Sequence, residues 1–325
     1  DALIPTNEGL FWEVLGFLKE CLYKPLSRVA QYQNKVFDIE KQNLKTYLDV
    51  DTENNYYYSE VKGRELYFVN EGLKVPKYGQ AELVEAETSF TAYQEFQSML
   101  TRDRIDIFMV GEFDDYQVLQ ALHRFPLEGR QVDLQFSYSQ PYVNVVKEKI
   151  EPRQSSQSIL QLGYQFPCQY GDKDYFALIV FNAMFGEFAH SALFTTLREK
   201  EGLAYSISSQ FDIFTGLLEV YAGIEKSNRN QAMRGISREL NYIKLGRFSS
   251  SLLNQTKKII RMNALLSEDH ALTLVEQRFY KVIFGDKSLS LENWLDEIEK
   301  VTKKDVCRVA RQVKLQSLFF LEGVS

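Results

Sequence analysis

The chain has 325 residues, of which 45% are hydrophobic and 25% are charged, so it can form about two ordinary domains and is neither disordered nor rich in membrane-spanning segments. Its net charge of −6, without a basic stripe, argues against a nucleic-acid binder. Its three widely spaced cysteines, Cys21, Cys168 and Cys307, do not resemble a disulfide framework, and we expect reduced thiols and a cytoplasmic location.

Helical periodicity dominates the first part of the chain. Apolar residues at helical spacing predict one helix around residues 11–22 and a second over residues 36–48. A third helix is expected to begin after Thr88, because threonine is a favourable N-cap residue. An apolar strand, Ile105 to Gly111, is expected to follow this third helix.

The same order of elements recurs later in the chain. Helices are predicted over residues 233–243 and 252–266, a third helix after Thr302, and a strand over residues 318–323. Thr302 lies 214 residues after Thr88, and Gly323 lies 212 residues after Gly111. Such a slowly changing offset predicts an internal duplication.

The second copy has an additional portion at its start. Strands are predicted over residues 159–166, 204–210 and 216–223, together with an apolar helix over residues 174–185. The first copy shows no counterpart, so the repeat implies that roughly seventy residues would precede Asp1.

We therefore predict an α+β fold with two homologous domains, each an antiparallel sheet packed against helices, the first incomplete at its start. The expected limits are residues 1–128 for the N-terminal domain, 129–144 for a linker rich in polar and turn-forming residues, and 145–325 for the C-terminal domain.

No catalytic residue is predicted from the sequence. The three histidines, His123, His190 and His270, are too far apart to share one helical face around a metal ion, and we interpret them as structural. The sequence also contains no nucleophile elbow and no glycine-rich phosphate-binding loop.

The most informative segment runs from Phe185 to Ser206. Its characteristic residues are Gly186, Ser191, Leu193-Phe194, Arg198-Glu199 and Gly202-Leu203-Ala204-Tyr205-Ser206. With these offsets the segment resembles the C-terminal domain of the pitrilysin/insulinase-like zinc metallopeptidases, which include mitochondrial processing peptidase. The flanking residues 211–216 and 263–269 are similar to a bacterial branch of that family encoded as two paired chains.

The resemblance implies that Arg198 and Tyr205 bind peptide substrate. An arginine offers a rigid fork of donors, and a tyrosine adds a directional hydroxyl. A purely structural interpretation stays open for both residues: Arg198 could pair with Glu199 or Glu201, and Tyr205 could be a half-buried strand residue.

The resemblance also locates a broken zinc site. Active family members carry His-x-x-Glu-His on a helix that would precede Asp1, and a further glutamate ligand seven residues after another glutamate. Here Glu40 matches the earlier glutamate, and Tyr47 occupies the ligand position. A neutral phenol is a poor zinc ligand, so we expect no metal in this chain and zinc in a partner chain.

The resulting hypothesis is a non-catalytic, substrate-binding subunit of a heterodimeric zinc-dependent peptide-processing peptidase. Its partner would be a peptidase-like chain with an intact zinc motif. Two alternatives stay open: an active zinc metallopeptidase whose His-x-x-Glu-His region is missing from this chain, and a homodimeric peptide-binding scaffold.

Overall fold

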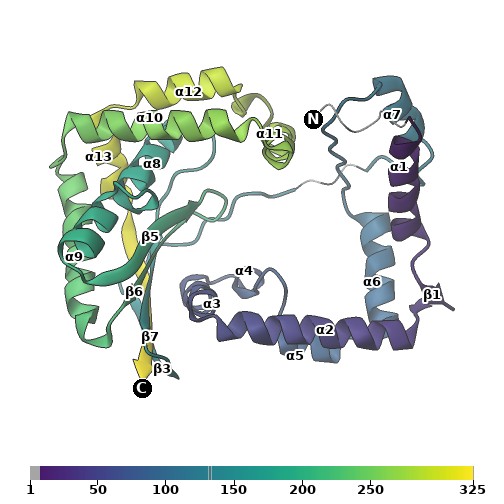
Figure 1. Ribbon diagram of the computed structural model, residues 1–325, viewed down its shortest axis with the longest axis horizontal. Helices are drawn as coiled ribbons and strands as arrows, with labels where there is room; N and C mark the ends of the chain where they lie inside the picture. The colour runs from purple at the N-terminus through teal and green to yellow at the C-terminus, as the bar shows by residue number, and fades with distance from the viewer. Residues whose placement is uncertain (1–7, 131, 133, 325) are drawn as a thin grey trace. The chain divides into compact units, whose positions relative to one another are not determined.

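The computed structural model describes residues 8–130, 132 and 134–324, which form two compact units (Figure 1). The first unit comprises residues 1–50 and 78–134, and the second comprises residues 51–77 and 135–325. The units therefore interleave along the chain. The domain limits expected from the repeat, 1–128 and 145–325, stay a prediction, because the boundaries of a compact unit need not coincide with those of a duplicated sequence.

The first unit is mainly helical. Its helices are α1 (Glu8–Tyr23), α2 (Asn34–Glu53, whose last residues belong to the second unit), α5 (Ala81–Ala86), α6 (Ser89–Arg102) and α7 (Asp115–Leu122). The strands β1 (Ser27–Arg28) and β2 (Gln31–Tyr32) pair in an antiparallel ribbon. The helices predicted around residues 11–22, over 36–48 and after Thr88 are confirmed.

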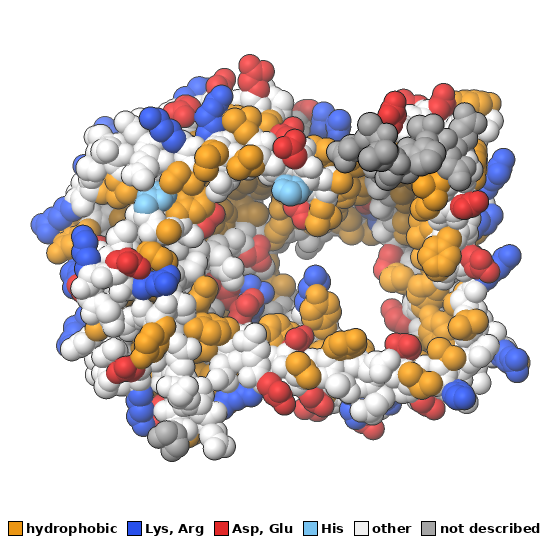
Figure 2. Space-filling model, viewed as in Figure 1, with side chains coloured by type: hydrophobic (Ala, Val, Ile, Leu, Met, Phe, Trp, Pro, Cys, Tyr) orange, Lys and Arg blue, Asp and Glu red, His pale blue; other side chains and the backbone are white. Residues whose placement is uncertain are grey.

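The first unit buries few large side chains. Among the residues that the structure describes in this unit, the buried hydrophobic ones are Leu15, Leu48, Leu100, Ala121 and Phe125. On α1, Phe17 is 69% exposed and Val14 is 56% exposed, and Figure 2 shows hydrophobic side chains at the surface over this unit. Its helices are therefore amphipathic, with part of their apolar surface facing outward.

The strand expected at Ile105 to Gly111 is wrong, because this segment has an irregular backbone. Ile105, Ile107 and Val110 are all exposed. A strand requires a neighbour for its backbone N–H and C=O groups, and within residues 8–130 no strand pairs with this segment. The prediction failed because it rested on apolar composition, which does not show whether a neighbouring strand is present.

The second unit contains a five-stranded mixed sheet. Its strands are β3 (Lys147–Gln154), β4 (Ser158–Gln165), β5 (Ala204–Asp212), β6 (Leu217–Ile224) and β7 (Lys314–Val324). Their order is β3-β7-β4-β6-β5, with β3 and β7 parallel and the other neighbours antiparallel. The four predicted strands of this region and the α+β fold class are confirmed.

One face of this sheet is covered by an apolar helical layer. The helices are α8 (Tyr175–Asn182), α9 (Arg229–Lys244), α10 (Ser250–Ser267), α11 (Ala271–Phe284), α12 (Leu291–Lys300) and α13 (Lys303–Gln312). Alternate strand residues such as Leu160, Val220 and Phe320 join the side chains of α8, α9 and α13 in one continuous core. None of the described helices is long and apolar enough to cross a membrane.

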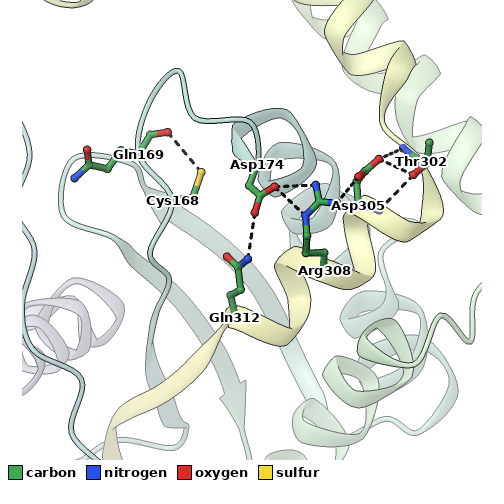
Figure 3. A network of polar contacts seen from close by, with 7 residues as sticks. All are labelled: Cys168, Gln169, Asp174, Thr302, Asp305, Arg308 and Gln312. Atoms are coloured by element: carbon green, nitrogen blue, oxygen red, sulfur yellow. Dashed lines mark hydrogen bonds and ion pairs between the residues drawn. The ribbon is translucent and has the colours of Figure 1, made fainter.

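A polar network fixes α13 to the start of α8 (Figure 3). Asp174, the N-cap residue of α8, accepts hydrogen bonds from Arg308 Nε and Nη2 at 3.0 and 2.8 Å and from Gln312 Nε2 at 3.1 Å. Arg308 also donates to Asp305, which forms the capping box of α13 with Thr302. The expected N-cap role of Thr302 is thus confirmed.

The opposite face is covered by α3 (Asn55–Tyr67), which is followed by α4 (Glu71–Lys74). Two glycines allow α3 to lie close to the sheet: a Cβ atom on Gly63 would be 2.6 Å from Gln161 Cγ, and one on Gly163 would be 2.9 Å from Tyr67 Cδ2. Arg64 Nε and Nη2 donate to the buried carboxylate of Glu219 at 3.0 and 2.7 Å. This interface therefore combines apolar contact with a buried charge.

Candidate functional site

The segment singled out by the sequence, Phe185 to Ser206, joins the helical layer to the last strand of the sheet. It begins within the π-helical turn η1 (Ala183–Glu187), contains the π-helical turn η2 (Phe194–Lys200), and then enters β5. At Gly186 a Cβ atom would lie 2.6 Å from Ser209 Oγ and 2.9 Å from the backbone nitrogen of Ser209. Glycine is therefore required here for η1 to lie against β5.

A tight turn connects η2 to β5. The backbone nitrogen of Glu201 donates to Thr196 at 2.9 Å, and that of Leu203 donates to Leu197 at 2.8 Å. Gly202 adopts a φ of +61°, the left-handed conformation that commonly ends a helix. The Gly-Leu pair of the motif thus places β5 directly after the helix that carries Arg198.

Arg198 lies on η2 with 43% of its side chain exposed. Its guanidinium carbon lies 4.5 Å from the ring centroid of Phe194, and its Nε atom lies 3.7 Å from Glu199 Oε1. An exposed ion pair of this length contributes little stability. Glu201, the other possible partner, pairs instead with Arg238 at 2.6 Å. The donors of Arg198 therefore remain accessible to a ligand.

Tyr205 lies at an irregular position of β5. Ala204 pairs with Ile224 and Ser206 pairs with Gly223, so Tyr205 is the extra residue of a β-bulge. The side chain of Tyr205 is largely exposed, at 57%, rather than half-buried. β5 is also at the edge of the sheet, since β6 is its one neighbour among the described strands.

The Tyr205 hydroxyl donates a hydrogen bond of 2.8 Å to Glu225 Oε1. This hydrogen bond to the carboxylate raises the pKa of Tyr205. The phenol oxygen keeps its lone pairs available as acceptors. Glu225 was not predicted as part of the site, although the register of the β5–β6 hairpin could have indicated it, because Glu225 directly follows the partner of Ala204.

Tyr47, the residue at the expected ligand position, lies on α2 in the first unit and is 71% exposed. Glu40 is on the same helix, where a spacing of seven residues corresponds to about two turns. A neutral phenol does not fit a zinc site that a carboxylate completes. Within the part of the chain that the structure describes, no three or more His, Cys, Asp or Glu residues are grouped to hold a metal ion.

The histidines occupy separate positions. His123 is the C-cap residue of α7, and His270 is the N-cap residue of α11. His190 Nε2 lies 2.9 Å from Thr256 Oγ1 on α10, and burial lowers the pKa of His190. Each therefore has a local structural setting at a helix end or against a helix.

Comparisons with known proteins agree with this organisation. The sequence pattern of a family described as "Peptidase M16 inactive domain" matches residues 93–260. A protein named "Probable inactive metalloprotease YmfF" from Bacillus subtilis is 32% identical over 310 residues, which are 95% of this chain and 72% of YmfF. Both descriptions are consistent with the prediction that no zinc is bound by this chain.

Solved structures show the same fold. The crystal structure of a conserved protein from Enterococcus faecalis V583 has 35% identity and a TM-score of 0.94, covering 99% of this chain and 76% of that chain. A peptidase M16 inactive domain from Pseudomonas fluorescens, with 16% identity, has a TM-score of 0.76 over 98% of this chain and 77% of that chain. The family pattern and YmfF together show that the chain belongs to the M16 peptidase family.

Proposed function

We propose that this chain is the non-catalytic, substrate-binding subunit of a heterodimeric zinc-dependent peptide-processing peptidase, with zinc held by the partner chain. The observation that carries the proposal is the placement of Arg198 and Tyr205, which are both accessible and lie on either side of the Gly202 turn. Tyr47 at the expected ligand position supports a non-catalytic role. A cytoplasmic location remains part of this proposal.

Together, Arg198 and Tyr205 suit the backbone of an extended peptide. The guanidinium of Arg198 donates, so it can bind a peptide carbonyl or carboxylate, and the ring of Phe194 restricts its orientation. The hydroxyl proton of Tyr205 is directed to Glu225, so its oxygen is suited to accept from a peptide N–H. The edge strand β5 adds backbone groups on its outer side.

The direct test combines the full-length protein with a peptidase-like chain that carries an intact His-x-x-Glu-His motif. Cleavage of a fluorogenic peptide is measured for each chain alone and for the mixture. We expect activity in the mixture at least about tenfold above that of the partner alone, since a subunit that fixes the peptide supplies binding energy worth about 1.4 kcal/mol or more. Equal activity of the partner alone would contradict the proposal.

Site variants test the two contact residues within that mixture. We expect Arg198→Ala and Tyr205→Phe to raise KM, by roughly tenfold for the arginine, because a hydrogen bond from a charged group contributes about 1.5–3 kcal/mol. The kcat should change little if these contacts are made equally in the bound and transition states.

Matched controls come from a similar pair outside the motif, Arg247 and Tyr242, whose guanidinium carbon and ring centroid are 5.7 Å apart. Arg247→Ala and Tyr242→Phe should leave KM unchanged. An equal rise in KM for motif and control variants would argue against substrate contact. Zinc-dependent cleavage by this chain alone would favour the active-peptidase alternative. Stable self-association, without any gain of peptidase activity on mixing with the partner, would favour the homodimeric peptide-binding scaffold.

A further inference from the structure

A cavity of about 430 Å³ lies within the second unit. Arg198 and Tyr205 do not line it, although Glu187 and Phe188 from the start of the same Phe185–Ser206 segment do. Its walls come from α8, η1, α10, α11, α12 and the loop before α8. This volume is within the range of small-molecule sites in proteins, roughly 300–1,000 Å³. The family resemblance and the proposed function leave this cavity without a role.

Aromatic rings form much of its lining. Tyr170, Tyr175, Tyr280 and Trp294 all line the cavity. The rings of Tyr170 and Tyr280 are parallel with centroids 5.7 Å apart, and those of Tyr170 and Tyr175 are 4.8 Å apart. Aromatic faces carry negative electrostatic potential and attract organic cations.

Among the described residues that line the cavity, one carries a carboxylate: Glu187 at the end of η1. Asn182 Nδ2 donates to Glu187 Oε2 at 2.9 Å, and Asn182 is itself held by Ser209 Oγ at 2.7 Å. In the described part of the chain, Glu187 Oε1 has no hydrogen-bond partner, and no lysine, arginine or histidine lines the cavity. Glu187 is therefore oriented but not neutralised.

The surroundings favour a cation further. Glu276 and Asp212 contribute to raising the pKa of Tyr280, after desolvation by burial. The Glu187 side chain is exposed to solvent at the cavity, and desolvation raises its pKa in spite of the opposing hydrogen bond from Asn182. A ligand that carries a positive charge would supply the cationic partner that no described side chain of the lining provides.

We propose that this cavity binds a small organic cation, an alkylammonium or arylammonium group with an apolar body, whose charge pairs with Glu187 while its body packs among Tyr170, Tyr175, Tyr280 and Trp294. A free amine and the side chain of a peptide lysine present the same chemistry. The proposal does not depend on a role in peptide processing.

The test is calorimetric titration of the full-length protein with three probes. These are 2-phenylethylamine, which is cationic at neutral pH, 2-phenylethanol, which is a neutral analogue of similar size, and lysine capped at both ends. We expect the amine to bind at least about tenfold more tightly than the alcohol, because one charge-assisted hydrogen bond distinguishes them. Equal affinity of amine and alcohol would overturn the proposal.

The capped lysine distinguishes the source of the ligand. Binding of this probe as tight as that of the amine, and equally dependent on Glu187, supports the cation site and assigns it to a peptide side chain. Binding by the amine alone supports a free small molecule.

Variants locate the site. Glu187→Gln keeps the acceptor for Asn182 and should weaken amine binding at least about tenfold while leaving alcohol binding unchanged. Ala264→Phe on α10 should fill the cavity and weaken both probes. Glu292→Gln removes an exposed charge on α12 that does not line the cavity, and should bind as wild type does. Wild-type amine affinity in both Glu187→Gln and Ala264→Phe would overturn the assignment.

Discussion

Helices α6 and α13 occupy matching positions of the sequence repeat, but their surroundings differ. Both begin with a threonine whose side chain takes part in a capping box, at Thr88 and at Thr302. On α13 the residues Val306, Val309 and Ala310 are almost fully buried, whereas α6 buries Leu100 and leaves Phe90 53% exposed. The chain after α13 forms β7, and the chain after α6 is irregular.

Helix capping on the one hand, and burial and strand formation on the other, therefore have separate causes. A capped helix depends on residues within one turn, so the repeat reproduces it in both units. Burial and strand formation depend on a sheet, which the described residues supply in the second unit. Variants at matching positions should therefore agree where the cause is local and differ where it is not.

The largest expected difference concerns the segments that follow these helices. Phe320 in β7 is 1% exposed, and Phe108, 212 residues earlier, is half-buried in an irregular segment. We expect Phe320→Ala to reduce the free energy of unfolding of the second unit by about 3–5 kcal/mol. Phe108→Ala should cost clearly less in the first unit. Hydrogen exchange measured by mass spectrometry reports the stability of each unit separately. Equal losses of stability in the two variants would contradict the expected difference between the two segments.

A second prediction tests the buried ion pair between α3 and the sheet. Arg64→Met would leave Glu219, whose side chain is 5% exposed, without its cation, and we expect a loss of about 2–3 kcal/mol. This value is below the usual cost of breaking a buried pair because Arg64 is itself 39% exposed. The double variant Arg64→Met/Glu219→Gln should recover much of the loss, as measured by urea denaturation, because a side-chain amide is uncharged and keeps an acceptor for Gln161 Nε2 and Gln210 Nε2.

The control for this prediction is on the same helix. Lys62 pairs with Glu65 at 2.8 Å, and both side chains retain solvent contact. Lys62→Met should cost no more than about 1 kcal/mol. If Arg64→Met cost as little as Lys62→Met, the buried charge would have no special importance for the docking of α3.

The sequence indicated what depends on short spacing and missed what depends on distant partners. Helical periodicity and the two threonine caps could be read directly from the sequence, and so could strands β4 and β6. The packing of α3 on the sheet of the second unit was not predicted, because it depends on Gly63 and Gly163, which are one hundred positions apart in sequence.

The candidate site shows the same division. The motif indicated Arg198 and Tyr205 as candidate residues, and the left-handed turn at Gly202 follows from local chemistry. The bulge that leaves Tyr205 unpaired, and its bond to Glu225, depend on the register between β5 and β6. No pattern within one strand specifies that register.

A third prediction compares the caps directly. Thr88→Ala and Thr302→Ala each remove a side-chain acceptor for the backbone nitrogen at the third helical position. We expect each to cost about 1 kcal/mol, because capping is local and largely independent of burial. Amide exchange in the first turns of α6 and α13 measures both, with Thr88→Ser and Thr302→Ser as controls that keep the hydroxyl. A loss confined to one helix would contradict a local origin.

The last prediction, for which we expect the weakest effect, concerns the difference in charge between the two capping boxes. At the third helical position the box of α13 has the carboxylate of Asp305, whereas that of α6 has the neutral hydroxyl of Thr91. The hydrogen bond from the Thr302 side chain lowers the pKa of Asp305 below its ordinary value of 3.8. Its stabilising contribution is therefore complete above that ordinary value and is lost as the pH falls through the lowered pKa.

Lowering the pH from 5 to 3 should begin to weaken the protection of the first-turn amides of α13 in the wild-type protein. In Asp305→Asn the same change of pH should weaken this protection less, because the carboxylate that titrates has been removed. Thr88→Ala should not alter the pH dependence in α6, because its capping box contains no carboxylate; Thr91 is kept in this control, since its hydroxyl also donates to Glu87. An unchanged pH dependence in Asp305→Asn would mean that neighbouring charges, such as Arg308, rather than the cap carboxylate govern the start of α13.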